Sequence, residues 1–497
     1  MGIVFRQSVI TTIISYCGVA IGYINLLYLY PKFLEPDQIG LMRTIQDAAI
    51  LFTPFAQFGL AQSILRYYPR LVTTKASSGS FIKLMLLLAL VGFSIFFLLF
   101  KIFEAPILSY FQTNAQEIIG YSSLVLWLTL ILLLMAIFEA YSRSLLKTVV
   151  PNLLREIVAR LLLAVLVLLY FAGYIDFNQF IISTALAYLL CLTILMLYLW
   201  TQGELQLRHN FDHLNKGELP GLIKYSLLSF AGMAGLIIIG KVDSIMVTGL
   251  MGLTANAVYT TAFYMATVIE IPKRALMQIA MPLISRAFEK NDMADIRQIY
   301  QKTSINQFIV GGLILIGIWA NLHNIFALMP KGEIYEAGKY VVMIVGLGKL
   351  LDMLFGPSSE IIVLSKYYSF NILLILLLAV SIVMANNLLI PLYGIDGAAI
   401  GSALALILFN LLKYIFIYAK LKMQPFTLST LKVLAIVLVA VGCNCLIPRM
   451  DMLLADLILR SSIITLVYGS LIIFSKASPD GNSVFRKVLI YTGITKS

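Results

Sequence analysis

The sequence predicts an all-α integral membrane protein, and three observations lead to that fold class. Of the 497 residues, 60% are hydrophobic and only 12% are charged, and the mean hydropathy is +0.94, far above the values of ordinary soluble domains. The apolar residues come in blocks of about 20, the length that a helix needs to cross the hydrocarbon of a bilayer. The strands of a membrane barrel would be shorter and would alternate in polarity.

The apolar blocks predict fourteen transmembrane helices. The first block follows the amino terminus and continues to Tyr30, without the short apolar core and small-residue cleavage site of a removable signal. We therefore expect the first span to be retained. The fourteen spans are expected at residues 8–30, 38–62, 81–103, 119–141, 153–173, 179–200, 224–249, 253–275, 305–328, 338–360, 368–391, 395–419, 429–447 and 455–475.

Lysine and arginine are distributed unevenly between the connections. They gather after the second, fourth, sixth, eighth and twelfth spans and in the tail, whereas the alternate connections carry few. Because short loops rich in these residues stay in the cytoplasm, both termini are expected to be cytoplasmic. The net charge of +12 mostly reflects this bias and contact with anionic lipid head groups, so no nucleic-acid partner is expected.

A repeat of about 220 residues relates the two halves of the apolar region. Ile175 and Asp176 open the sixth span, and Ile395 and Asp396 open the twelfth, 220 residues later. Transporters are often built from two such copies related by an axis along the membrane normal, with the substrate path between them. The predicted organisation is a six-helix lobe at 1–201, a cytoplasmic linker at 202–222, a second six-helix lobe at 223–422, two further helices at 423–475 and a cytoplasmic tail at 476–497.

Two charged residues interrupt the apolar seventh span, in the stretch GKVDSIMVTGL from Gly240 to Leu250. A charge at the centre of a bilayer costs about 3 kcal/mol on insertion scales, so it persists where it is paired or faces water or a ligand. Lys241 and Asp243 are two residues apart and point about 200° apart on a helix, so they cannot pair with one another. Each is expected to meet a neighbouring helix, a ligand or water.

Other charges inside the predicted spans extend this candidate site. Cations in a low-dielectric cleft favour an anion, and phosphate accepts charge-assisted hydrogen bonds from lysine and arginine. The acids would hold the cations in place or bind a coupling Na⁺ or H⁺. The expected substrate-binding residues are Lys241, Arg43, Lys349 and Arg274, and the expected ion-coupling or charge-pairing residues are Asp243, Asp47, Asp352 and Glu270.

Structural roles compete with a functional one at several of these positions. Arg43 lies near the outer end of its span, from which its side chain can reach the lipid head groups instead of a cavity. Lys349 and Asp352 share a helix face and can form a buried structural pair as readily as contact a ligand. Lys241 lies deepest in its span, so a functional role is favoured there.

Motifs for catalysis or for a metal site are not evident. His209 and His213 are four residues apart, but no cysteine or third histidine accompanies them, so no metal site is expected. No nucleophile or glycine-rich phosphate loop stands out, and the outer connections are short. We therefore expect a protein that is not an enzyme and that has no catalytic residues and no cofactor.

Two stretches carry a resemblance to a known family. The first is YPKFLEPDQIG at residues 30–40, which contains the pattern L-x-P-x-x-x-G that joins the first two helices of Wzx-type flippases for polysaccharides and the O-antigen of lipopolysaccharide. The second is GIDGAAIGSA at residues 394–403, which resembles the start of the twelfth helix in that family. The length and the fourteen spans match as well, so the resemblance covers essentially the whole chain.

The resemblance implies a member of the multidrug/oligosaccharidyl-lipid/polysaccharide exporter superfamily in the inner membrane of a bacterium. Its substrate would be an undecaprenyl-diphosphate-linked oligosaccharide, carried to the outer leaflet by alternating access. The expected partners are this lipid-linked sugar, membrane lipids and a polysaccharide polymerase, with the protein itself a monomer.

Two other functions compete with this interpretation. A cation-coupled multidrug antiporter of the same superfamily often has an acid in its first helix, and residues 8–30 contain none. A polymerase or ligase acting on lipid-linked sugars would need a sizeable outer loop with catalytic groups, and the predicted outer connections are short.

Overall fold

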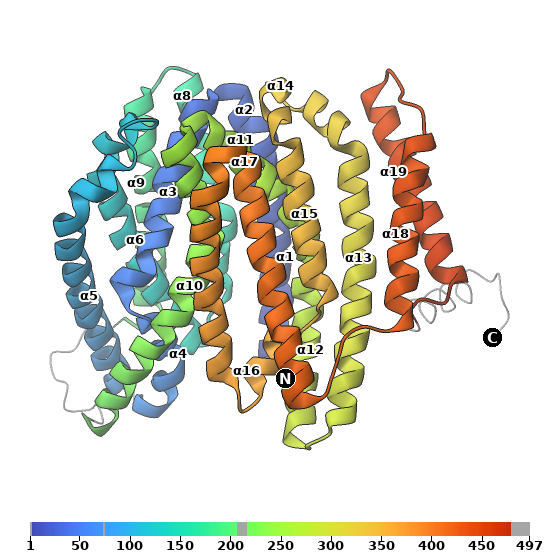
Figure 1. Cartoon of the computed structure of the whole chain (residues 1–497). Helices are drawn as coiled ribbons and strands as arrows, with labels where there is room; N and C mark the ends of the chain where they lie inside the picture. Colours follow the sequence, from blue (N-terminus) through green and yellow to red (C-terminus); the bar gives the residue numbers. More distant parts are fainter. Residues whose placement is uncertain (1, 73–74, 206–215, 479–497) are drawn as a thin grey trace. The chain divides into compact units, whose positions relative to one another are not determined.

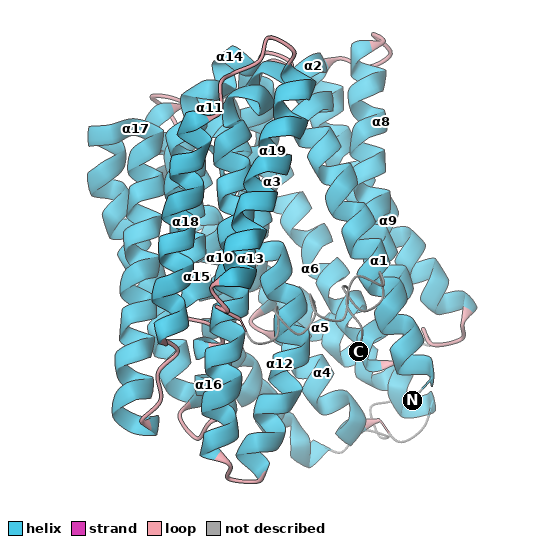
Figure 2. Ribbon diagram, turned by 90° about the vertical axis from the view of Figure 1, so that its right-hand side faces the viewer, coloured by secondary structure: helices cyan, strands magenta, loops and turns pink. Residues whose placement is uncertain are grey.

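The computed structural model describes residues 2–72, 75–205 and 216–478. Figure 2 shows helices and connecting loops, and no strand, among these residues. The predicted all-α fold class is therefore confirmed. The chain forms two compact units, residues 1–257 and 258–497, each of which is described by itself.

The first unit contains ten α-helices and most of its length is helical within the described residues. Two π-helical turns, η1 and η3, and two short 3₁₀ turns, η2 and η4, join or extend them. The elements are α1 (Gly2–Ile24), η1 (Asn25–Leu29), α2 (Tyr30–Phe33), α3 (Pro36–Gln57), α4 (Leu60–Leu71), α5 (Lys75–Ser109), η2 (Gln116–Tyr121), α6 (Ser122–Ser144), α7 (Val149–Leu153), η3 (Leu154–Val158), α8 (Ala159–Phe171), α9 (Phe177–Thr201), η4 (Lys216–Glu218) and α10 (Leu219–Met251).

Helix α11 (Leu253–Thr267) begins at the end of the first unit and continues into the second. In the second unit α13 packs against α12, α15, α18 and α19, and α15 packs along α17. The remaining elements are η5 (Val268–Glu270), α12 (Ile271–Glu289), α13 (Met293–Leu328), α14 (Gly332–Tyr335), η6 (Glu336–Gly338), α15 (Lys339–Leu354), α16 (Ser358–Leu364), α17 (Tyr368–Leu421), α18 (Leu428–Leu446) and α19 (Leu453–Phe474).

Helical structure covers all fourteen predicted spans, although several helices are broken. Within the described part of the chain, nine helices are long and apolar enough to cross a membrane, or eleven if each of two bent pairs is one span. The bent pairs are α3 with α4, at 45°, and the segment 332–354 with α16, at 47°. The seventh predicted span is one continuous helix, α10. The eighth predicted span is divided among α11, η5 and α12.

Helix α17 contains two of the predicted spans in one run of 54 residues. At 1.5 Å per residue a straight helix of that length would extend about 80 Å, far more than a bilayer requires. The run folds back at Gly394, whose φ of 60° and ψ of −138° lie outside the helical region. Figure 1 shows the two halves of α17 running antiparallel on either side of this turn. Only glycine adopts such a backbone conformation readily, which explains the glycine at the start of the GIDGAAIGSA stretch.

The compact unit that contains the predicted first lobe, residues 1–201, also contains the next helix. Helix α10 packs along α3 and α4, and it therefore belongs to the compact unit 1–257. Helices α18 and α19 pack on α13 and on each other. The linker at 202–222 and the tail at 476–497 lie partly outside the described residues. The two-lobe boundaries of the sequence analysis remain a prediction.

The start of α3 explains the L-x-P-x-x-x-G pattern in physical terms. Pro36 is the first residue of the helix, where its missing N–H costs no hydrogen bond. The backbone N–H of Glu35 donates to Oε1 of Gln38 at 3.0 Å, as one half of a capping box. A Cβ on Gly40 would lie 2.0 Å from the carbonyl oxygen of Leu253, so the position requires glycine. The pattern therefore fixes the start of α3 against the start of α11.

The surface of the described helices is rich in large apolar side chains. Leu446 and Phe474, for example, are 83% and 84% exposed. Soluble monomers rarely expose extended apolar surface, whereas hydrocarbon is a favourable neighbour for it. Together with the candidate spans, this makes the chain a multi-pass membrane protein.

Candidate functional site

The first charge cluster consists of Arg43 and Asp47 on α3 and Lys241 and Asp243 on α10. Nζ of Lys241 lies 2.5 Å from Oδ1 of Asp47, and the two side chains are 19% and 5% exposed. The two residues are 194 positions apart in the sequence, and the packing of α10 along α3 brings them together. Asp243 is buried on the opposite side of α10, as the two-residue spacing requires. The deep lysine of the seventh span therefore has a carboxylate partner on a neighbouring helix.

Arg43 lies one helical turn from Asp47 but makes a different contact. Its guanidinium carbon lies 5.7 Å from the centre of the Tyr30 ring, and Tyr30 is buried in α2. A cation over an aromatic face is stabilised by the negative face of the ring. Arg43 is partly buried, so it is held by the protein at this position.

A network of neutral polar side chains continues from the first charge cluster along α3 and α10 and includes Asn256 at the start of α11. The hydroxyls of Thr44 and Thr248 are 2.8 Å apart. Nδ2 of Asn256 donates to the Thr44 hydroxyl at 2.9 Å, and the Ser244 hydroxyl donates to Oδ1 of Asn256 at 3.0 Å. All four residues are buried. Hydrogen bonds between helices replace water in an apolar surrounding, so this network fixes the register of α10 on α3.

The second charge cluster lies in the other unit and contains Glu270, Lys273, Lys349, Asp352 and Lys413. Lys273 forms an ion pair with Asp352, which also accepts a hydrogen bond from Nδ2 of Asn410 at 3.0 Å. Lys349 pairs with Glu270 at 3.1 Å. These contacts join η5 and α12 to α15 and α17. The broken eighth span places its charges on the face that meets α15.

Lys349 and Asp352 share a face of α15, and a pair between them was one of the two alternatives that the sequence left open. In the structure Lys349 pairs with Glu270 and Asp352 pairs with Lys273, so both partners belong to the eighth span. Asp47 likewise pairs with Lys241 on a neighbouring helix.

The predicted set omitted a deeply buried cation. Lys413 is only 2% exposed; its Nζ donates to the Ser359 hydroxyl at 3.0 Å and lies 4.2 Å from the centre of the Phe409 ring. Its position inside the twelfth predicted span, several residues from the end, is a sequence signal that identifies it. Arg274, in contrast, was included and is exposed at the start of α12.

Each cluster presents lysines whose charge is compensated by carboxylates at an intramembrane position. Such a lysine can exchange its carboxylate for a phosphate oxygen, because both are anionic acceptors of the same hydrogen bonds. Among the described residues no group of three histidine, cysteine, aspartate or glutamate side chains has the arrangement of a metal site. His209 and His213 lie outside the described residues. The described residues of both clusters thus form ion pairs between lysines and carboxylates.

Comparison with known proteins gives the family. The model of the family described as "Polysaccharide biosynthesis protein" matches residues 4–288, more than half of the chain. The chain belongs to this family. A search of the curated proteins found no match.

Solved structures give the fold independently of sequence similarity. A structure described as "Lipid II flippase MurJ, inward closed conformation" superposes with a TM-score of 0.75 over 94% of this chain and 99% of that chain, at 13% identity. An inward-facing multidrug resistance MATE family transporter of the MOP superfamily gives 0.65, over 80% and 94%, at 12% identity. A MOP superfamily transporter from Pyrococcus furiosus gives 0.52, over 84% and 93%, at 11% identity.

The polysaccharide biosynthesis protein therefore shares its fold with the structures described as a lipid II flippase and as MATE family transporters. The low identities make the likeness one of fold alone.

Proposed function

We propose that the protein is a flippase that carries an undecaprenyl-diphosphate-linked oligosaccharide from the cytoplasmic to the outer leaflet by alternating access. Membership in the polysaccharide biosynthesis family and the transporter fold support a lipid-linked sugar as cargo. Undecaprenyl carriers indicate the inner membrane of a bacterium, with both termini in the cytoplasm. A polysaccharide polymerase would use the product in the outer leaflet, and the transporter itself acts as a monomer.

The observation that carries this proposal is the lysine inside α10. Lys241 is held by Asp47 in the first charge cluster, at a depth where an unpaired charge is costly. A diphosphate that displaces Asp47 would keep the lysine neutralised while binding it. Arg43, Lys349 and Arg274 are the other cations that we assign to the anionic head group. The long isoprenoid chain would stay in the lipid.

Membrane electrostatics supports the direction of transport. A diphosphate carries about two negative charges, and each is worth about 2.3 kcal/mol per 100 mV, so a negative interior favours outward passage by about 4.6 kcal/mol. Return of the empty, cationic site is then the costly step. We propose that Na⁺ or H⁺ bound at the acids Asp243 or Glu270, with Asp47 and Asp352 as charge-pairing residues, assists that return.

The test is transport of a fluorescent undecaprenyl-diphosphate oligosaccharide in proteoliposomes. Lys241→Ala is expected to abolish transport and Lys241→Arg to retain part of it, because arginine keeps the charge but changes the geometry. Lys147→Ala is the matched control. Lys147 pairs with Glu204 at 2.9 Å and is 24% exposed, close to the 19% of Lys241, but it follows α6 instead of lying within a span.

The possible outcomes test the flippase function and the role of Lys241 separately. Transport that is lost in Lys241→Ala and retained in Lys147→Ala supports both. Transport that survives Lys241→Ala keeps the flippase and removes Lys241 from the substrate site. A folded parent protein that moves none of several lipid-linked sugars, and moves cationic drugs instead, replaces this proposal with the multidrug antiporter.

A further inference from the structure

A cavity of about 660 Å³ lies in the second unit, and its lining includes no residue of either charge cluster. Residues of α13, η6, α15, α18 and α19 line it, at the end of the unit where α13 ends and α19 begins. Its volume falls in the range of sites that enclose a small organic ligand. Nothing in the flipping mechanism uses this cavity.

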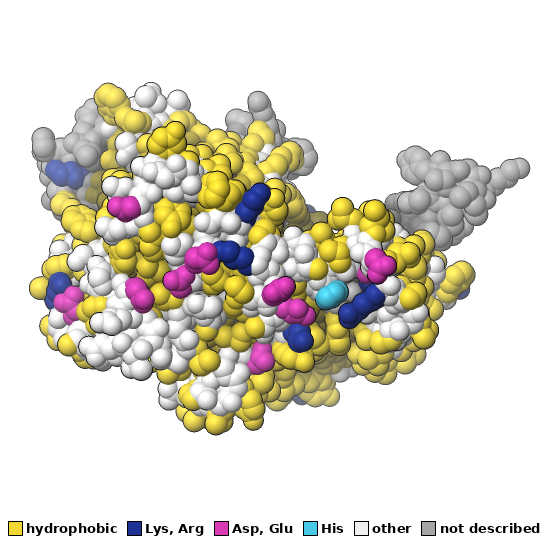
Figure 3. Space-filling model, turned by 90° about the horizontal axis from the view of Figure 1, so that it is seen from above, with side chains coloured by type: hydrophobic (Ala, Val, Ile, Leu, Met, Phe, Trp, Pro, Cys, Tyr) yellow, Lys and Arg dark blue, Asp and Glu magenta, His cyan; other side chains and the backbone are white. Residues whose placement is uncertain are grey.

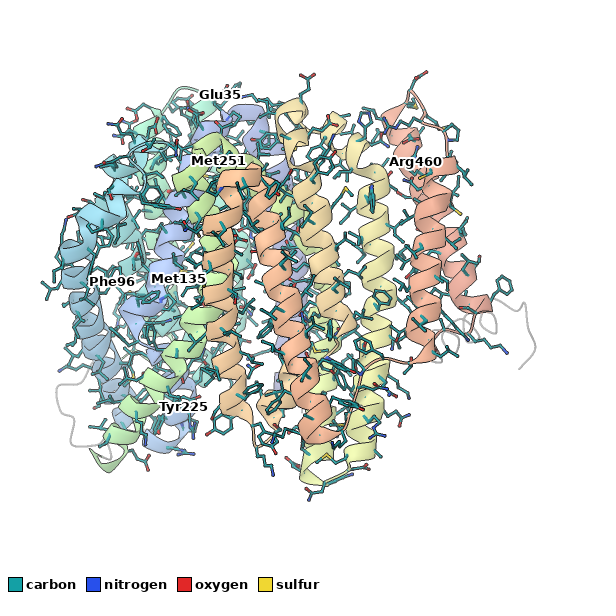
Figure 4. All side chains as sticks on the ribbon, viewed as in Figure 1. Glu35, Phe96, Met135, Tyr225, Met251 and Arg460 are labelled. Carbon is teal, nitrogen blue, oxygen red and sulfur yellow. The ribbon has the colours of Figure 1, made fainter. Side chains whose placement is uncertain are left out.

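The charged side chains at the floor of the cavity are paired with one another and hydrogen-bonded to the protein. Arg460 and Asp456, one turn apart on α19, form a buried ion pair with contacts at 3.0 and 3.1 Å. Arg460 also donates to Oδ1 of Asn444 at 2.9 Å and to the carbonyl of Pro448 at 3.2 Å. Asp456 accepts a further hydrogen bond from Asn324 at 2.5 Å. Figure 4 labels Arg460 on α19, beside α13.

The mouth of the cavity differs from its floor, because within the described part of the chain its polar groups are not joined by ion pairs, although Nζ of Lys339 lies 5.2 Å from the centre of the Tyr340 ring. The side chains of His323, Glu336, Lys339 and Arg449 line the mouth. Among residues 2–72, 75–205 and 216–478, none of the four makes an ion pair or a side-chain hydrogen bond. Figure 3 views this end of the molecule and shows side chains of both charges beside a histidine. A ligand would find donors and acceptors here that are not already occupied.

An aromatic wall completes the site. Trp319 lines the cavity and is 37% exposed, although its large ring would be buried in a closed core. Trp319, His323 and Phe326 are spaced four and three residues apart, so they share one face of α13. The cavity therefore combines a flat apolar surface with polar groups of both kinds.

This combination selects among ligand classes. A simple anion would use the cations but neither Glu336 nor Trp319, and a lipid chain would use neither charge. A sugar ring offers hydroxyl groups that both donate and accept hydrogen bonds, and an apolar face of C–H groups that stacks on an aromatic ring. The charged side chains of the lining can bond to the hydroxyl groups of a sugar, and Trp319 can stack on its apolar face.

We propose that this cavity binds a short oligosaccharide, with Trp319 stacked on a sugar ring and Glu336, Lys339 and Arg449 bonded to its hydroxyl or acidic groups. The identification of that saccharide with the glycan of the transported lipid rests on the proposed function, whereas the binding itself does not. In the proposed orientation the cavity opens on the outer side, where it would hold the glycan as the head group leaves.

The experiment uses the full-length protein in lipid nanodiscs and an array of neutral, acidic and amino-sugar oligosaccharides from bacterial surfaces. The strongest binder is then titrated as the free oligosaccharide, which carries neither lipid nor diphosphate. Trp319→Ala is expected to weaken binding about tenfold, the loss typical of one aromatic contact. Glu336→Gln is expected to weaken it as well, and both variants leave the ion pair on the floor intact.

Matched controls separate this site from the rest of the protein. Trp127→Ala removes another exposed tryptophan, 63% exposed on α6 of the first unit, and is expected to leave binding unchanged. Lys241→Ala is expected to leave sugar binding unchanged too, so a failed transport assay and a failed binding assay are distinguishable. Sugar binding equal in the parent and Trp319→Ala overturns the proposal. So does an array without any bound glycan, or competition by a short-chain phosphatidylethanolamine in place of sugar.

Discussion

The ion pair between Lys241 and Asp47 yields a quantitative prediction about stability. Replacing Asp47 by asparagine leaves Lys241 charged at a position where only 19% of its side chain is exposed. Replacing both residues, in Asp47→Asn/Lys241→Gln, removes the charges together. We expect the single variant to lower the free energy of unfolding by more than the double variant, because removing one carboxylate beside a partly buried ammonium costs more than removing both charges.

The structure sets the magnitude. At a separation of 2.5 Å and an effective dielectric constant of about 20, the Coulomb attraction is about 7 kcal/mol. Removing the carboxylate of Asp47 from water, at 5% exposure, costs several kcal/mol and offsets most of that attraction. The remaining coupling between the two residues is about 2 kcal/mol.

A double-mutant cycle measures this coupling, with unfolding in detergent micelles followed by circular dichroism as sodium dodecyl sulfate is added. The matched cycle uses Glu204→Gln and Lys147→Gln, whose pair is 2.9 Å apart with 19% and 24% exposure. Because the carboxylate of Glu204 is more exposed than that of Asp47, its coupling is expected at about 0.5 kcal/mol. Equal coupling in the two cycles, or a double variant less stable than Asp47→Asn, refutes the reasoning.

Three other predictions follow from the same contacts. Gly40→Ala is expected to destabilise the protein by about 3 kcal/mol, because its Cβ would lie 2.0 Å from the carbonyl oxygen of Leu253; thermal unfolding compares it with Gly120→Ala, where nothing lies within 4 Å and little change is expected. Asp352→Asn is expected to cost about 3 kcal/mol and Glu270→Gln about 1 kcal/mol in the same measurement, because the side chains are 10% and 21% exposed. Transport in proteoliposomes is expected to accelerate with an inside-negative potential and to respond to a Na⁺ or H⁺ gradient; a rate indifferent to all three gradients contradicts the proposed coupling.

The helices and the deep charges could be predicted from the sequence because both depend on local composition. Blocks of about 20 apolar residues specify helices in a bilayer wherever they occur, and all fourteen predicted segments are helical. The expectation that Lys241 meets another helix follows from helical geometry, and Lys241 does pair with Asp47 on α3. The turn at Gly394 was also placed between two spans, although the structure joins them with almost no loop.

The partners of those charges could not be predicted, because they depend on which helices pack together. Lys241 meets Asp47 across 194 residues and Lys273 meets Asp352 across 79, and no single-helix spacing contains that information. The alternative of a pair between Lys349 and Asp352 relied on spacing within one helix, and in the structure both residues pair with the broken eighth span. Lys413 was omitted although its position inside the twelfth predicted span, several residues from the end, was a signal for a buried charge.

The carboxylate beside Lys241 has a consequence for the strength with which cargo is held. An anion that reaches this lysine meets a counter-ion already in place, so loading is a substitution of one anion for another. The free energy of binding is the difference between two similar contacts. The occupied and the vacant site therefore have similar free energies. A lysine without a carboxylate partner would bind a diphosphate with higher affinity and release it more slowly. Because Lys241 already has a carboxylate partner, binding and release of the diphosphate would both involve only a small change in free energy.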